Sequence, residues 1–121
     1  FTLLFRHLAE GLRGDMSPAR TLFDDPTALD PWLARWSARL AKGGENSHAL
    51  AAEMDRVNPA YIPRNHLVEQ ALVAASSSSD FGPFERLLEV LERPFERRAG
   101  LAGYEGPAPD EFGPYVTYCG T

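Results

Sequence analysis

Residues 58–72 read NPAYIPRNHLVEQAL, with two prolines four residues apart just before an apparent helix. Pro59 disfavours helical geometry at Asn58, so a helix that precedes it should end there. Pro63 is the second proline of the stretch, and an apolar face at helical spacing begins after it. That face consists of Leu67, Val68, Ala71, Leu72 and Ala75. The stretch therefore predicts a stiff bend that leads into a helix.

Four segments before the bend are also predicted to be helical. Apolar residues recur at helical spacing in residues 1–12, 30–42 and 47–57, and a short helical piece runs from Ser17 toward Phe23. Ser and Asp favour N-caps, and proline is tolerated in the first turn of a helix. We therefore interpret these residues, where they precede an apolar repeat, as signals for a helix start. The predicted start signals are Ser17–Pro18, Asp30–Pro31 and Ser47.

The chain after the bend is predicted to contain a loop, a last helix and a tail. Ser76 to Ser79 form the loop, and Asp80 caps a helix that Pro94 ends. In that helix Phe84, Leu87, Leu88 and Leu91 are expected to face inward, and Glu85, Glu89 and Glu92 to face outward. The tail is rich in Gly and Pro, with Tyr115 to Tyr118 as its one candidate extended stretch.

Together these patterns predict an all-α fold, a small bundle of about five helices followed by an irregular tail. We expect a helical domain at residues 1–102 and an extended C-terminal tail at residues 103–121, which carries Cys119. The length of 121 residues fits one domain, and 44% apolar residues fit a folded one. The indole rings of Trp32 and Trp36, four residues apart, are expected to lie in its core.

Composition argues against several classes of partner. The formal net charge of -5 disfavours a broad phosphate-facing surface, so no nucleic acid is expected. No apolar run approaches the roughly 20 residues that a membrane span needs. Cys119 is the one cysteine, so no disulfide can form within these residues and a reducing cytoplasm is expected. Because Phe1 stands where an initiator Met would, the chain looks cut from a longer one.

Candidate chemistry is sparse. His7, His48 and His66 lack the spacing of metal ligands, and no glycine-rich phosphate loop is present. The acidic pairs Asp24–Asp25 and Asp110–Glu111 lie beside prolines in expected surface turns. We therefore predict no catalytic, cofactor-binding or metal-binding residue in this chain.

The polar residues after the bend are the remaining candidates. Arg64 is predicted in the first turn of a helix, where the helix dipole disfavours a cation unless it reaches a distant anion. Asn58 can instead cap the turn at Tyr61 and Ile62, and Asn65 or His66 can bond to a neighbouring element without any ligand. The partner of this group can lie inside or outside the chain.

Five ordered motifs resemble one known family. They are FTLLFRHLA, DPWLARWSARLA, MDRVNPAYIPRNHLVEQAL, DFGPFERLLEVLERPF and YVTYCGT, and they occur in order from one end of the chain to the other. In this order they resemble the C-terminal region of the selenoprotein O (YdiU, UPF0061) family. The resemblance implies a protein-kinase-like fold that transfers AMP from ATP to Ser, Thr or Tyr hydroxyls of other proteins, with Mg or Mn as the metal. It also implies a bacterial cytoplasmic protein whose ATP-binding residues lie upstream of these 121 residues.

Three residues gain roles from the resemblance. Cys119 matches a near-terminal Cys or selenocysteine that in some members forms a redox-regulatory disulfide with the kinase-like region. The ending Cys-Gly-Thr differs from the Cys-Ser-Ser of other members. Arg64 and Asn65 are expected to make interdomain contacts with the upstream kinase-like domain, and protein substrates would be partners of the whole enzyme.

Two other readings stay open. In one, the chain is a free-standing helical interaction module whose apolar stripes bury against a separate protein. In the other, it is a small thiol enzyme, which would need Cys119 held beside a base.

Overall fold

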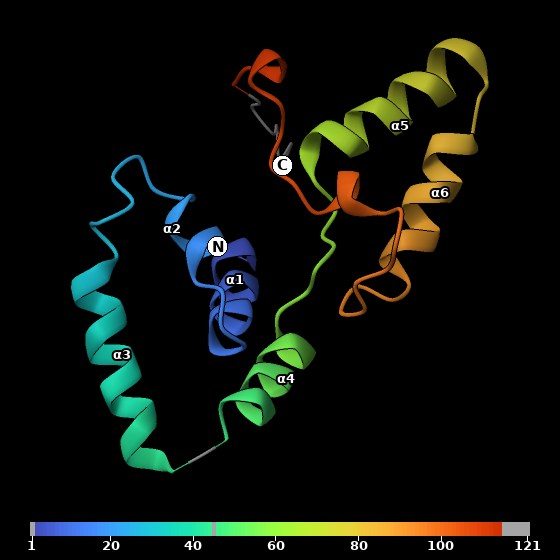
Figure 1. Cartoon of the computed structure of the whole chain (residues 1–121). Coiled ribbons are helices and arrows are strands. Elements are labelled where there is room, and N and C mark those ends of the chain that lie inside the picture. Colours follow the sequence, from blue (N-terminus) through green and yellow to red (C-terminus); the bar gives the residue numbers. More distant parts are fainter. Residues whose placement is uncertain (1, 45, 115–121) are drawn as a thin grey trace, which may run out of the picture. The chain divides into compact units, whose positions relative to one another are not determined.

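The computed structural model describes residues 2–44 and 46–114 (Figure 1). These residues contain six α-helices, two short 3-10 helices and no strand, which confirms the predicted all-α class. The α-helices are α1 (Thr2–Leu12), α2 (Ser17–Arg20), α3 (Asp30–Gly43), α4 (Ser47–Val57), α5 (Asn65–Ser78) and α6 (Gly82–Leu91). The 3-10 helices are η1 (Ala102–Tyr104) and η2 (Asp110–Phe112).

The chain divides into two compact units, Phe1–Ala60 and Tyr61–Thr121. The boundary falls inside the proline-containing stretch that the sequence singled out. The predicted division into residues 1–102 and a tail at 103–121 stays a prediction. None of the helices in the described parts of the chain combines the length and the apolar character needed to cross a bilayer.

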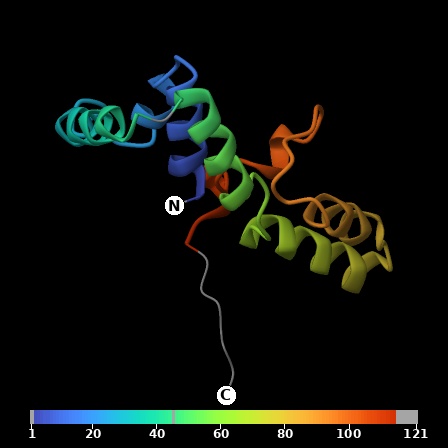
Figure 2. The same cartoon turned by 90° about the horizontal axis from the view of Figure 1, so that it is seen from below.

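The first unit is built around α1, which packs against α2 and α4 (Figure 2). Its core consists of Leu8, Ala19, Leu29 and Leu33, each less than a tenth exposed. The stacked rings of Trp32 and Trp36 have centroids 5.6 Å apart. Trp36 packs against this core, but Trp32 is 38% exposed, so the predicted core position is right for Trp36 and wrong for Trp32.

The second unit pairs α5 with α6 (Figure 1). Tyr61 and Val90 are its largest fully buried side chains, each 1% exposed. The Tyr61 backbone amide donates to the carbonyl of Pro94 at 3.1 Å, and the Tyr61 hydroxyl accepts from the amide of Arg98 at 2.7 Å. Tyr61 thus ties the start of this unit to the segment that follows α6.

Several helix boundaries differ from the prediction. The N-caps of α2, α3 and α6 are Met16, Leu29 and Phe81, none of them with a side-chain cap bond, and not the predicted Ser17, Asp30 and Asp80. The serines expected to form a loop instead extend α5 to Ser78, and Ser79 adopts the left-handed conformation that ends the helix. The Ser76 hydroxyl donates to the carbonyl of Val73 at 3.3 Å, so it bonds along the helix instead of breaking it. Once α5 is established, adding residues of middling propensity is cheap, because propagation costs far less than nucleation.

The N-cap of α4 is also one residue earlier than predicted. The Asn46 carboxamide oxygen accepts from the amides of His48 at 2.9 Å and Ala49 at 3.3 Å, so Asn46, not Ser47, is the cap. Asn is at least as good a cap as Ser, and Ser47 is left as the first helical residue.

Candidate functional site

The polar residues of the joint surround the N-terminus of α5. Arg64 is the extended residue just before the helix, with φ -70° and ψ 135°, not a residue of its first turn as predicted. Its carbonyl accepts from the amides of Leu67 at 3.0 Å and Val68 at 2.9 Å. Its Nη2 donates to the carbonyl of Glu105 at 2.6 Å.

The Arg64 guanidinium is only partly compensated. Its Nε is buried and has no hydrogen-bond partner within the described residues. Burial lowers the pKa of this guanidinium, because removing water disfavours the charged form. The carboxylate of Glu105 is engaged elsewhere, since its Oε2 lies 2.9 Å from Nη2 of Arg97. Arg64 therefore makes no ion pair in the part of the chain that the structure describes.

His66 and Asn65 stand beside this cation in different environments. His66 is 6% exposed, and its ring meets Phe112 edge to face with centroids 5.9 Å apart. Asn65 is exposed. Neither side chain makes a hydrogen bond within residues 2–44 and 46–114, so the predicted bond to a neighbouring element is absent there. His66 contacts its neighbour through ring packing instead.

Asn58 has a different role from the one predicted. Its Nδ2 donates to the carbonyl of Met54 at 2.8 Å, and its own amide donates to the same carbonyl at 3.0 Å. Asn58 thus satisfies the C-terminus of α4 and does not cap the turn at Tyr61 and Ile62.

A pocket of about 330 Å³ opens at this helix end, and we call it the α5 N-terminal pocket. Its polar lining comes from Arg64, Asn65 and His66. Its other lining residues are Ile62, Pro63, Pro107, Ala108, Phe112 and Gly113. The pocket combines one cation and a helix N-terminus with largely apolar walls.

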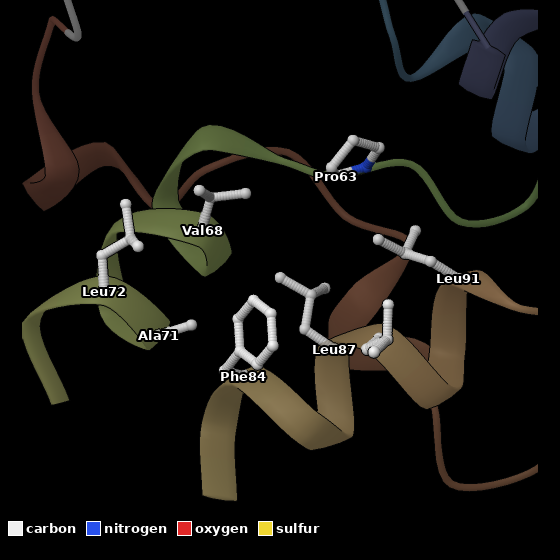
Figure 3. A pocket seen from close by; sticks show the side chains of 8 residues that line it. Pro63, Val68, Ala71, Leu72, Phe84, Leu87 and Leu91 are labelled. Carbon is white, nitrogen blue, oxygen red and sulfur yellow. The ribbon is translucent and has the colours of Figure 1, made fainter. Parts of the chain in front are cut away.

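A second hollow, of about 200 Å³, lies between α5 and α6 and is almost wholly apolar. We call it the α5–α6 groove, and it is lined by Pro63, Val68, Ala71, Leu72, Phe84, Leu87, Leu88 and Leu91. Figure 3 shows side chains of the two helices converging on it. Leu87 is buried as predicted, whereas Phe84 and Leu88 line this groove beside α5 but stay 47% and 52% exposed.

The other sequence candidates are not assembled into a site. Cys119 and the stretch Tyr115 to Tyr118 lie outside the described residues. His7 pairs with Glu10 at 3.0 Å, and His48 is exposed on α4. Over residues 2–44 and 46–114, no three or more His, Cys, Asp or Glu side chains gather as a metal site would require. No group of these side chains therefore forms a candidate metal site in the described residues.

An ion pair of a buried arginine in the first unit was not predicted from the sequence. Arg6 is 5% exposed, and its Nη1 lies 3.0 Å from Oδ1 of Asp55. Arg13 binds the other carboxylate oxygen of Asp55 at 2.7 Å. Arg6 Nη1 also donates to the carbonyls of Asp55 at 3.1 Å and Asn58 at 3.3 Å. These bonds hold α1 against the end of α4, so we interpret them as stabilising the fold.

Comparison with known proteins finds close relatives over the full chain. No protein-family model matches it. A protein nucleotidyltransferase YdiU of Mycobacterium sp. (strain KMS) is 50% identical over 121 residues, which is 100% of this chain and 23% of that protein. Proteins of the same name are 47% identical in Bradyrhizobium sp. (strain BTAi1), over 123 residues and 25% of that protein, and 47% identical in Sphingopyxis alaskensis, over 121 residues and 25% of that protein.

These alignments cover every residue of the chain, but the chain spans only about a quarter of the length of the curated relatives it matches. At 45 to 50% identity without a break in coverage, two sequences share their fold and ancestry. The resemblance read from the five motifs is confirmed, because the whole chain matches about a quarter of each of these YdiU proteins.

Proposed function

We propose that residues 1–121 are a non-catalytic helical portion of a longer protein nucleotidyltransferase. The observation that carries this proposal is the similarity, over the whole chain, to relatives named protein nucleotidyltransferase YdiU. The activity proposed for the parent protein is transfer of AMP from ATP to Ser, Thr or Tyr hydroxyls of other proteins in the bacterial cytoplasm. ATP and Mg or Mn would be bound by a kinase-like domain upstream of these residues.

The α5–α6 groove supports a packing role for the segment. Leu72, Phe84 and Leu88 are each about half exposed there, and burying the remaining half of such a side chain is worth about 1 kcal/mol. About three quarters of the length of the relatives lies outside the matched region, which supplies polypeptide to cover the groove. We therefore propose that the groove receives apolar side chains from the rest of the parent protein.

Cys119 is proposed as a redox-regulatory thiol of the same protein. The support is its match to the near-terminal Cys or selenocysteine of the family, and the thiol is the group that disulfide exchange requires. A cysteine in the upstream domain would be its disulfide partner.

The AMP-transfer activity proposed for the parent protein is tested by measuring which phosphate of labelled ATP is incorporated into protein. Full-length protein is incubated with a protein substrate and ATP labelled on either the α- or the γ-phosphate. In AMP transfer the hydroxyl oxygen bonds to the α-phosphorus, pyrophosphate leaves and the hydroxyl proton is released, so only the α-label enters protein. Removal of divalent metal with a chelator should abolish the signal. Entry of the γ-label instead would show phosphate transfer and refute the proposal.

A further inference from the structure

The α5 N-terminal pocket has positive polarity that nothing in the described chain neutralises. The first amides of an α-helix have no acceptor within the helix, and Arg64 provides no side-chain cap for them. The amides of Asn65 and His66 have no acceptor in the described residues. The first turn of α5 contains no acidic residue that would offset the helix dipole.

His66 gives an independent indication of a ligand. It is more than nine-tenths buried, it lines the pocket, and its ring nitrogens make no hydrogen bond within the described residues. The Nε of Arg64, which lines the same pocket, is buried without a partner in the described residues, and an unsatisfied buried polar group costs about 1–3 kcal/mol. An acceptor that enters the pocket would remove this cost for Nε of Arg64 and would give a partner to whichever ring nitrogen of His66 carries the proton.

The positive charge of Arg64 determines how much negative charge a ligand of the pocket should carry. A single guanidinium, held in place by the carbonyl of Glu105, balances one negative charge. Most of the remaining wall is apolar and offers no donor to a doubly charged phosphate. A planar carboxylate suits both the guanidinium and the free helix amides.

We propose that the α5 N-terminal pocket is a receptor for one carboxylate, supplied by an Asp or Glu side chain of the parent polypeptide outside residues 1–121. The pocket is large enough for such a side chain, at about 330 Å³. Glu105, which lies beside Arg64, is already paired with Arg97. The inference rests on the proposed function in one respect, that the segment packs against a longer chain.

The test is zero-length cross-linking of the full-length protein. Lys42 is the one lysine among the 121 residues, so Arg64→Lys introduces a single new amine at the pocket while keeping the positive charge. A carbodiimide then joins that amine to any carboxylate in direct contact. The matched control is Arg86→Lys on α6, an exposed position with no partner in the described residues.

We expect mass spectrometry to find position 64 joined to an Asp or Glu outside residues 1–121, on the order of tenfold more often than position 86, because a held contact raises the effective concentration. Absence of this product overturns the proposal. So does a cross-link to an acid within residues 1–121, or to a second copy identified by isotope mixing. AMP transfer by the same preparation reports on the proposed function separately.

The unsubstituted protein provides a second measurement, in case Arg64→Lys does not fold. Arginines of the full-length protein are labelled with a dicarbonyl reagent at about 0.05 and 1 M salt, across which the screening length falls to about 3 Å. Salt should increase labelling of Arg64 as its ion pair weakens and leave the exposed Arg86 unchanged. Labelling of Arg64 that does not respond to salt overturns the proposal.

Discussion

Arg6 carries a positive charge into the interior of the first unit, where Asp55 and two carbonyls hold it. Replacing it by Met removes these contacts but leaves Asp55 paired with Arg13 at 2.7 Å. We expect Arg6→Met to lower the free energy of unfolding by about 2–3 kcal/mol, measured by urea denaturation of the full-length protein.

The control is Arg56→Met, which removes an exposed pair with Glu53 on α4. Surface pairs of this kind contribute at most about 1 kcal/mol. An equal decrease in the free energy of unfolding of the two variants would show that the buried Arg6 stabilises the fold no more than an exposed arginine does.

Single residues were the least predictable part of the site. The misfit of Arg64 at a helix start was visible in the sequence, because a cation there opposes the helix dipole. The Arg6–Asp55 pair was not, since its members lie 49 residues apart and neither sits on an apolar stripe. The burial of His66 depends on Phe112, which follows it by 46 residues, and helical spacing carries no information about such distant contacts.

Helix α6 has an exposed apolar face, on which Phe84 and Leu88 line the α5–α6 groove. If the rest of the parent protein covers this groove, Leu88→Ser should lower the free energy of unfolding of the full-length protein by about 1.5–3 kcal/mol. Glu89→Ser, at the neighbouring exposed position, should change it by no more than about 0.5 kcal/mol. A Leu88 variant as stable as the control would mean that the groove faces water in the whole protein.

Helices were predicted well as elements and less well at their ends and faces. The repeat of apolar residues identified α1, α3, α4, α5 and α6, because this signal is summed over several turns. It could not tell which apolar residues of α6 are covered within the chain. Val90, which was not among the residues predicted to face inward, is 1% exposed, whereas Leu88 lines the open α5–α6 groove and is 52% exposed.

For the whole molecule, the all-α class and the family could be predicted from sequence alone. The family followed from five motifs in a fixed order, which is far more specific than any one of them. The kinase-like fold and the role of Cys119 stay predictions, because their test requires the part of the protein that these residues do not contain. The α5 N-terminal pocket likewise emerged only from the fold, which brings Phe112 against His66.

The central claim is that these helices support nucleotide transfer without performing it. It is tested most directly by incubating ATP labelled on the α-phosphate with the full-length protein and, separately, with residues 1–121, each in the presence of the same protein substrate and Mg or Mn. We predict that label enters protein with the full-length chain and not with the segment. Transfer of label by residues 1–121 alone, or none by the full-length protein, would contradict the account.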